Sequence, residues 1–363
     1  MLEALCELYP EADIFTHVYA PERISETIRR HRVRTTLISK LPYARRLYQS
    51  YLPLMPFALE QLDLRAYDLV ISCESGPAKG VLTRPDALHI CYCHTPMRYA
   101  WNMYQEYREG LSGLKRWAMS VFLHKIRQWD VTTAARVDHF VANSHNVARR
   151  IRKYYRRDAI VIEPPVDLDR FGVDTFTSAD DFSLCIGQLI PYKQVGLAVT
   201  AFNRLGRRLV VVGEGTQRDE LGKLAGPNIT FLERVDDTIL RDYYTRCRAL
   251  VFTAVEDFGI VPLEAMAAGK PVIAFGKGGA LETVVSGRTG LFFHEPTPEA
   301  LVEAVQAFET MERSFVPADI AAHARRFSKA RFKESFLRFV HNAAGGNNSI
   351  ASVSRETQWD LAA

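Results

Sequence analysis

The sequence lacks any long uninterrupted apolar run, although hydrophobic residues make up 47% of its 363 residues. No stretch approaches the roughly 20 apolar residues that a membrane-spanning helix needs. The first residues also lack the basic region followed by an apolar segment that is typical of a secretion signal. We therefore expect a globular, cytoplasmic protein that is long enough for two cores of ordinary size.

Cysteine and the common catalytic or cofactor patterns are also scarce. The six cysteines fall mostly inside apolar, strand-like runs and form no pair of metal-spaced clusters, so we interpret them as reduced core residues. The glycines Gly213 and Gly215 lack the third glycine of a dinucleotide fingerprint. They also belong to the third strand-helix unit, whereas such a fingerprint belongs to the opening one. The pair Asp167 and Asp169 resembles a metal-binding DxD string, but its proline-rich surroundings favour a linker with helix-capping aspartates. No Ser-His-Asp or Cys-His arrangement can be identified from spacing.

The charge imbalance is small, and a net charge of +4 does not indicate nucleic-acid binding. The positive residues are nevertheless clustered, at 29–34 and at 149–157. Such clusters are most often solvated faces, and the alternative is peripheral contact with anionic lipid or a phosphorylated acceptor. The mixture of aromatic, apolar and basic residues from Lys115 to Asp130 favours that alternative, although an amphipathic core helix has the same pattern.

Two blocks of strand and helix patterns are separated by the segment EPPVDLDRF, at 163–171. Its two prolines and three acids are typical of a domain boundary. The second block alternates apolar strands with helices from SLCIG onward, which predicts a parallel sheet and a Rossmann-like α/β domain. The first block opens on the helical pattern LEALCELYP, whereas a doubly wound sheet normally opens with a strand and a glycine-rich or polar turn.

The segment 249–279 has the pattern of a strand, a polar turn, a helix and a second strand. Glu256 lies in the turn, and Glu264 lies on the helix. Lys193, just past another predicted strand, and the glycine-rich turn at 276–279 fall at the same edge of the sheet, where open α/β sheets bind ligands. A lysine and helix amino termini suit a diphosphate, and a helix-borne carboxylate suits a ribose diol. The pattern therefore predicts a nucleotide-sugar site.

A second candidate site follows the predicted strand Leu88 to His94, in the motif HTPMRYAW. His94, Arg98 and Trp101 come directly after the strand, at the edge where a ligand is expected. A lone histidine at a strand end is more often a structural hydrogen-bonding residue than a reactive group. Spacing alone leaves both interpretations open.

These motifs resemble those of a known family. The segment EDFGIVPLEAMAAGKPVIAFGKGGALETVVSGRTGLFF closely resembles the donor-site signature of the retaining glycosyltransferases of family 4, whose E-x7-E pair matches Glu256 and Glu264. Together with HTPMRYAW it is most similar to bacterial mannosyltransferases that use GDP-mannose in lipopolysaccharide (O antigen) or exopolysaccharide biosynthesis. The resemblance covers nearly all of the chain. It implies a GT-B architecture, in which two Rossmann-like domains face each other across a cleft.

The resemblance also implies a domain plan with four parts. Residues 1–165 would form the acceptor-side domain and 166–322 the nucleotide-sugar-binding domain, while 323–344 would be a helix that crosses back to the first domain and 345–363 a disordered tail. Family members have a first strand and a glycine-rich loop ahead of the LEAL helix. The first domain here lacks that strand, so we expect a gap in its sheet. Either the natural start lies upstream or the product is impaired, and we favour an upstream start.

Ten residues match positions that the family uses for donor binding and catalysis. The predicted catalytic residues are Glu256, Lys193 and His94, and the predicted donor-binding residues are Glu264, Gln188, Phe258, Gly259, Ile260, Arg234 and Val235. By this resemblance Glu264 would bind the ribose hydroxyls and Lys193 would neutralise the leaving diphosphate. The turn from Glu256 to Ile260 would hold the sugar and its phosphate, with His94 contacting the sugar from the opposite domain.

The remaining three residues concern the base and the diphosphate. Arg234 and Val235 sit where such enzymes hold the base of the nucleotide. Gln188 stands where many family members have arginine, so one of the two cations expected on the diphosphate is missing.

The implied reaction is retaining transfer of a hexose, with mannose from GDP-mannose passed to a lipid-linked oligosaccharide at the inner face of the plasma membrane. No cofactor or metal is expected, because Lys193 and the helix end after Phe258 would stabilise the negative charge that grows on the departing diphosphate. Two alternatives remain: the same fold with a UDP-sugar donor, and a truncated nucleotide-sugar-binding protein without transfer activity.

Overall fold

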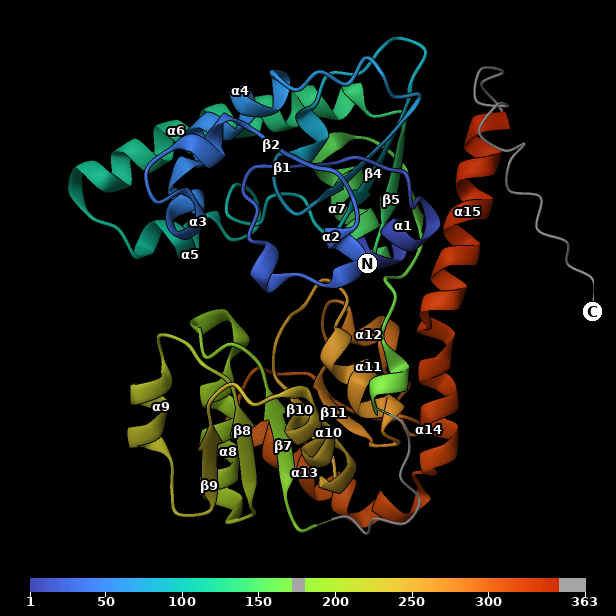
Figure 1. The fold of residues 1–363 in the computed structure, drawn as a ribbon. Helices are drawn as coiled ribbons and strands as arrows, with labels where there is room; N and C mark the ends of the chain where they lie inside the picture. Colours follow the sequence, from blue (N-terminus) through green and yellow to red (C-terminus); the bar gives the residue numbers. More distant parts are fainter. Residues whose placement is uncertain (172–179, 346–363) are drawn as a thin grey trace, which may run out of the picture. The chain divides into compact units, whose positions relative to one another are not determined.

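The computed structural model describes residues 1–171 and 180–345. The chain divides into two compact units, one formed by Met1–Glu163 with the chain from Phe332 onward and the other by Pro164–Arg331. Figure 1 shows that both units are built from parallel strands with helices packed against them. The predicted α/β class is confirmed. The predicted disordered tail lies, apart from Gly345, outside the described residues.

The second unit contains a six-stranded sheet in which every pairing is parallel. Its strands are β7 (Ser183–Ile186), β8 (Leu209–Val212), β9 (Ile229–Leu232), β10 (Leu250–Phe252), β11 (Val272–Phe275) and β12 (Gly290–Phe293). Most are short apolar runs, as expected where helices cover both faces of a sheet. The strand order is β12-β11-β10-β7-β8-β9, so the order reverses between β7 and β10. The sheet is doubly wound, with its switch point between those two strands.

The helices of the second unit follow the predicted alternation with the strands. They are α8 (Val195–Leu205), α9 (Arg218–Leu224), α10 (Asp237–Arg246), α11 (Ile260–Ala267), α12 (Ala280–Thr283), α13 (Pro298–Met311) and α14 (Pro317–Ala324), with short 3-10 turns η6 (Leu168–Phe171), η7 (Pro191–Lys193), η8 (Glu312–Ser314) and η9 (Arg325–Phe327). The side chains of Asp236 and Thr297 accept backbone hydrogen bonds at the starts of α10 and α13. One large core fills the unit.

The first unit contains two separate parallel sheets. The strands β1 (Ile14–Thr16) and β2 (Val33–Thr35) pair with each other, and β3 (Leu69–Glu74), β4 (Leu88–Cys93), β5 (His139–Ala142) and β6 (Ala159–Val161) form the second sheet in that order. Within the described part of the chain, no strand joins the two sheets. The interruption that the sequence predicts for this domain is therefore present.

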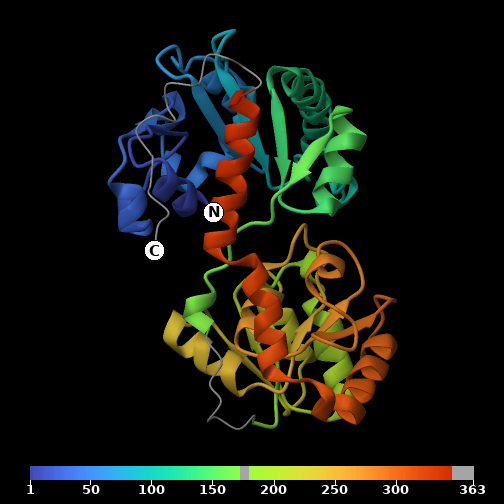
Figure 2. The same cartoon turned by 90° about the vertical axis from the view of Figure 1, so that its right-hand side faces the viewer.

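The first unit contains eight helices among the described residues, and some of them pack against its larger sheet. They are α1 (Leu2–Leu8), α2 (Glu26–Arg29), α3 (Ala44–Leu47), α4 (Met55–Glu60), α5 (Tyr104–Glu109), α6 (Gly113–Thr133), α7 (His145–Tyr155) and α15 (Lys329–Gly345), with 3-10 turns η1 (Pro21–Arg23), η2 (Leu37–Lys40), η3 (Tyr48–Leu54), η4 (Ala78–Gly80) and η5 (Ala134–Arg136). Figure 2 shows the carboxyl-terminal part of α15 lying across the four-stranded sheet. Phe332, Phe336 and Phe339 of this helix share a core with Ile90 and Tyr92 of β4.

The prediction of one helix at 323–344 is wrong in its bounds. The helical segment breaks after α14 and η9, and α15 begins only at Lys329. Ser328 has extended backbone angles, φ −68° and ψ 156°. The carbonyl oxygen of Phe327 accepts a hydrogen bond from the Val166 N–H at 2.9 Å, which replaces the bond that a continuous helix would make there. The competing partner lies about 160 residues away, so local periodicity could not reveal the break.

The six cysteines are free thiols, and five of them are buried while Cys73 is half-buried. Burial raises the pKa of Cys185 and of Cys247 to about 12, which keeps both as neutral thiols. The interpretation of the cysteines as reduced residues is confirmed, and most of them belong to the cores.

Candidate active site

Two of the predicted site residues meet at the switch point of the second unit's sheet. After β7 the chain passes into η7, which ends at Lys193, and after β10 it passes into the turn that carries Glu256. The Lys193 ammonium forms an ion pair with the Glu256 carboxylate, and the two side chains are 20% and 21% exposed. The Thr253 hydroxyl donates to the Lys193 carbonyl oxygen at 2.8 Å. The pair therefore joins the two loops between which open α/β sheets bind ligands.

The turn from Glu256 to Gly259 is held by the glycine-rich turn that follows β11. The Gly279 N–H donates to the Glu256 carbonyl oxygen at 2.8 Å. A Cβ atom on Gly279 would lie 2.2 Å from the Phe258 carbonyl oxygen, so only glycine permits this approach. Gly259 has φ 98°, which also favours glycine, and it brings the chain directly into α11. The N–H groups of Ile260 and Val261, at the start of α11, then lack intrahelical acceptors and suit an anion beside Glu256, whereas Pro262 has no N–H.

Glu264 lies farther along α11 and is held by a buried tyrosine. The Tyr244 hydroxyl, on α10, donates to the Glu264 carboxylate at 2.8 Å, and Tyr244 is fully buried. Burial raises the pKa of Glu264 above its usual value, while the Tyr244 hydrogen bond and the nearby Arg170 act in the opposite direction. Arg170 also forms an ion pair with Asp237. Glu264 is therefore an oriented, largely desolvated acceptor, which suits a pair of hydroxyl groups.

The other predicted donor-binding residues follow strands of the same sheet. Gln188 comes after β7 and is exposed, and Arg234 and Val235 come after β9. The Arg234 N–H donates to the Glu214 carboxylate at 3.4 Å, and Val235 packs against the core. Among the described residues, no hydrogen bond or ion pair joins the three to Lys193. They share an edge of the sheet with the pair of Lys193 and Glu256 but do not form one contact cluster with it.

His94 belongs to the first unit and follows β4. Its Nε2 atom lies 3.2 Å from the Cys73 Sγ atom, and its ring packs edge-on against Tyr92 with 5.2 Å between the centroids. Burial lowers the pKa of His94 to about 4, so the ring is neutral near pH 7. A neutral imidazole has one donor and one acceptor, and with Nε2 beside Cys73 the Nδ1 atom is the one left to meet a sugar hydroxyl.

The motif that contains His94 is anchored by a buried charge pair that sequence analysis missed. Lys79 of η4 and Asp130 of α6 form an ion pair and are both fully buried. The same carboxylate accepts hydrogen bonds from the Trp101 Nε1–H at 2.7 Å and the Tyr155 hydroxyl at 3.0 Å. Asp130 is the only acid in the 21 residues of α6, and an isolated acid on such a helix is the signal that could have revealed it.

Tyr244 and Arg170, beside Glu264, were likewise not predicted from the sequence. Each is a common residue type in a helical or linker pattern, so nothing local marks either one. Their positions follow from the packing of α10 and η6 against α11.

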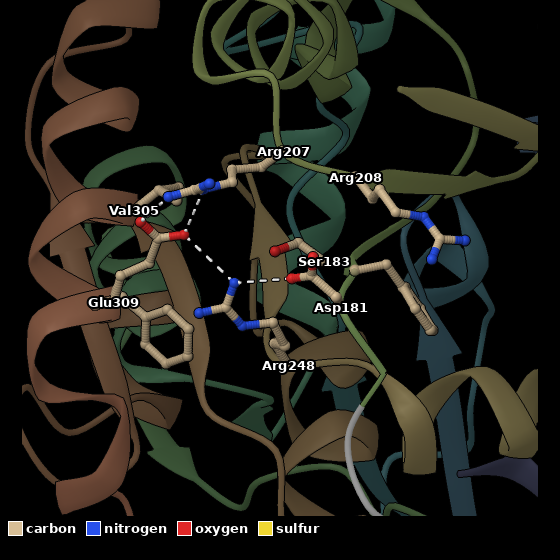
Figure 3. A pocket seen from close by; sticks show the side chains of 9 residues that line it. Asp181, Ser183, Arg207, Arg208, Arg248, Val305 and Glu309 are labelled. Carbon is tan, nitrogen blue, oxygen red and sulfur yellow. Dashed lines mark hydrogen bonds and ion pairs between the residues drawn. The ribbon is translucent and has the colours of Figure 1, made fainter. Parts of the chain in front are cut away.

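A hollow in the second unit lies at the opposite edge of the sheet (Figure 3). Ser183 begins β7 and Arg248 precedes β10, so this is the edge of the strands' amino ends. Arg248 pairs with Asp181 at 3.2 Å and with Glu309 at 3.4 Å, and Arg207 pairs with Glu309 at 2.9 Å. Arg207 and Arg248 are compensated by carboxylates of the same unit, so this part of the hollow is an ion-pair network.

Two solved structures share the fold of this chain. A sucrose-phosphate synthase from Thermosynechococcus elongatus aligns with a TM-score of 0.72 and 18% identity, covering 95% of this chain and 92% of that chain. HepE from Anabaena, in complex with UDP and glucose, aligns with a TM-score of 0.68 and 17% identity, covering 93% and 95%. The two Rossmann-like units thus define a protein of the GT-B class.

Two family models divide the chain between them. The model described as Glycosyltransferase Family 4 matches residues 1–170, and the model described as Glycosyl transferases group 1 matches residues 172–330. Both matches are to glycosyltransferase models, and they confirm the resemblance to glycosyltransferase family 4 found in the motifs.

The curated relatives include mannosyltransferases. A D-inositol 3-phosphate glycosyltransferase from Geodermatophilus obscurus is 30% identical over 250 residues, which are 60% of this chain and 55% of the relative. A GDP-mannose-dependent alpha-(1-6)-phosphatidylinositol monomannoside mannosyltransferase from Mycobacterium tuberculosis is 33% identical over 172 residues, which are 40% and 45%. The chain spans about half the length of the curated relatives it matches.

Proposed function

We propose that this chain is a retaining hexosyltransferase that moves mannose from GDP-mannose to a saccharide acceptor. The observation that carries the proposal is the pairing of Lys193 with Glu256 at the switch point, with Glu264 on the helix that follows. A GDP-mannose-dependent relative supports the choice of donor. Family membership supports transfer rather than hydrolysis.

In the proposed complex the nucleotide diphosphate lies over the switch point. Its ribose hydroxyls donate to Glu264, whose position the Tyr244 hydroxyl maintains. Its phosphates accept from the first N–H groups of α11 and from Lys193, which exchanges part of its contact with Glu256 for the diphosphate. Gln188 supplies a neutral amide where many family members have an arginine as the second cation on the diphosphate. Arg234 and Val235 flank the base.

Transfer in this proposal depends on charge. When the bond between the sugar and the phosphate breaks, negative charge grows on the nucleoside diphosphate. Lys193 and the amino-terminal end of α11 stabilise this charge more in the transition state than in the ground state. The departing phosphate helps to deprotonate the acceptor hydroxyl, which attacks from the same face, so the configuration is retained. His94 contacts the sugar as a neutral hydrogen-bonding group. We propose that no metal takes part, and turnover assayed in EDTA tests this.

The donor is tested by calorimetric titration of the protein with GDP, UDP and their sugars. We expect GDP and GDP-mannose to bind more tightly than the uridine counterparts. Tighter binding of UDP-glucose or UDP-N-acetylglucosamine would replace GDP-mannose by a UDP-sugar donor, the alternative that the likeness to the UDP complex of HepE favours. Binding of no nucleotide would overturn the proposed function.

The raised pKa of Glu264 predicts a pH dependence of donor binding. Because burial raises this pKa, the carboxylate is lost as the pH falls through a value above the usual 4.3 or so of glutamate. We expect nucleotide affinity to decrease over that range, and Tyr244→Phe to move the midpoint to higher pH, since its hydrogen bond lowers the pKa of Glu264. Titration of affinity against pH by calorimetry measures both midpoints.

The control for this pH profile is Glu264→Gln, which cannot ionise. Its nucleotide affinity should be weaker at pH 7, and its pH profile should lack the midpoint assigned to Glu264. Protonation of the nucleotide phosphates also changes affinity with pH, but it does so equally in all variants. A profile for Tyr244→Phe that coincides with that of the unchanged protein would remove Tyr244 from this role.

We also propose that the acceptor is lipid-linked and that the protein contacts the inner face of the plasma membrane peripherally. No helix in the described residues is long and apolar enough to cross a membrane. The clustered basic residues of the first unit support a surface contact of this kind. Lipopolysaccharide or exopolysaccharide synthesis is the proposed setting.

A further inference from the structure

Helix α6 carries a stripe of large apolar side chains that faces solvent. Leu114, Trp117 and Val121 are 77%, 64% and 44% exposed. Their spacing of three and four residues places them on one face of the helix. Isolated exposed apolar residues are ordinary, but three in a row along one helix face form a surface that water solvates poorly.

This stripe is not the face by which α6 packs into its own unit. The buried residues of the helix are Leu123, Ile126, Asp130 and Thr133, all in its carboxyl-terminal half. Every residue from Ser112 to Ala118 is exposed. Figure 1 shows the amino-terminal end of α6, together with α5, lying away from β4 and β5. The stripe therefore contributes little to the fold of the unit.

The residues around the stripe are positively charged. Exposed Lys125 follows Val121 by four residues and shares the face of the stripe, and exposed Lys115 and Arg116 lie on the other faces of α6. The sequence from Leu111 to Trp129 contains no acid. The acids that flank this stretch are Glu109 on α5 and the buried Asp130, and α5 also carries Glu106 and the 49% exposed Tyr107. A second copy of the same stripe would bring like charges together, whereas an anionic surface would neutralise them.

We propose that the amino-terminal half of α6 is the surface by which this protein docks on an anionic lipid bilayer. Leu114, Trp117 and Val121 enter the boundary between headgroups and acyl chains, Lys125 pairs with lipid phosphates, and Lys115 and Arg116 add positive charge on the other faces of the helix. Apolar and aromatic side chains flanked by cations are the combination that binds this interface. The inference gives the proposed membrane contact a specific surface and does not require glycosyl transfer.

The test is flotation of the full chain with vesicles of phosphatidylcholine alone or mixed equally with phosphatidylglycerol, without nucleotide or acceptor. We expect binding to the anionic vesicles at about 0.1 M salt and weaker binding at about 1 M. The double variant Leu114→Ser/Lys115→Ser should bind them at least about tenfold more weakly, since it loses an apolar side chain and a cation.

A matched control removes the same two residue types elsewhere. Leu224 and Lys223 are adjacent and exposed on α9 of the second unit, and Lys223→Ser/Leu224→Ser should bind vesicles like the unchanged protein. A blue shift of tryptophan fluorescence on vesicle binding should disappear in Trp117→Phe. Circular dichroism and the melting temperature of each variant exclude unfolding as the cause.

Three results would overturn the proposal. The first is equal binding to neutral and anionic vesicles, and the second is equal binding by the α6 and α9 double variants. The third is a dimer in solution that Leu114→Ser/Lys115→Ser dissociates while the unchanged protein ignores vesicles, which would assign the stripe to a second copy of the chain. Because the vesicle assay contains no donor, a negative result would not count against nucleotide binding or glycosyl transfer.

Discussion

Lys193→Ala is expected to lower turnover about 100-fold while changing donor affinity much less, which corresponds to about 2.7 kcal/mol of transition-state stabilisation. In the resting protein the Lys193 charge is already compensated by Glu256, with both side chains about one-fifth exposed. Its attraction for the bound donor is therefore partly offset. When the diphosphate departs, its charge increases, and an ammonium group at this position then gains more than it does in the ground state.

Steady-state and single-turnover kinetics, with affinity from calorimetry, separate the two effects of this substitution. Lys193→Arg keeps the cation and should retain a larger share of turnover, and Lys223→Ala, an exposed lysine on α9, should change neither quantity. Wild-type turnover in Lys193→Ala would refute the assignment. If the unchanged protein binds donor but transfers nothing to a range of acceptors, the chain is a nucleotide-sugar-binding protein.

Asp130→Ala is expected to lower the free energy of unfolding of the first unit by about 3–5 kcal/mol, because it removes the counter-charge of a fully buried ammonium. The same substitution takes away the acceptor of the Trp101 indole and of the Tyr155 hydroxyl. Lys79 also stacks over the Tyr155 ring at 4.8 Å, an attraction that is too weak to replace the carboxylate. Urea denaturation followed by tryptophan fluorescence measures the loss.

The control for this prediction removes both charges together. Lys79→Met/Asp130→Leu should recover much of the stability that Asp130→Ala loses, since two apolar side chains of similar volume leave no buried charge. A loss below about 1 kcal/mol in Asp130→Ala would show that water or a rearranged partner compensates Lys79. Restored stability without restored turnover would indicate that the pair also positions the segment from His94 to Trp101.

The elements of the second unit could be predicted well because their patterns are local. The strands β8 and β11 are continuous apolar runs with glycine or proline beside them, and the helices between strands have ordinary lengths. β12 was not predicted, since Gly290–Phe293 is short and follows α12 without a helix of full length. The break between α14 and α15 was also missed, because Val166 supplies the competing hydrogen bond from a distant part of the chain.

The candidate site also has features that the sequence predicts and contacts that only the packing of its elements reveals. Parallel strands bring their carboxyl ends to one edge, so the sequence alone assigns Lys193, Glu256 and Glu264 to a shared ligand edge. Their direct contacts could not. The ion pair of Lys193 with Glu256 depends on β7 and β10 being neighbours in the sheet, and the Tyr244 hydrogen bond depends on how α10 packs on α11.

By itself, the sequence determined the α/β class, the alternation of strands and helices that gives a parallel sheet, the family resemblance, and the residues that stand at strand ends. Each of these follows from short-range patterns or from motifs that are contiguous in the chain. Only the tertiary structure decided which side chains meet: the buried pair of Lys79 and Asp130, the orientation of Glu264, and the solvent-facing stripe on α6. Contacts between residues far apart in the sequence depend on how whole elements pack, and burial is a property of the packed chain rather than of any segment.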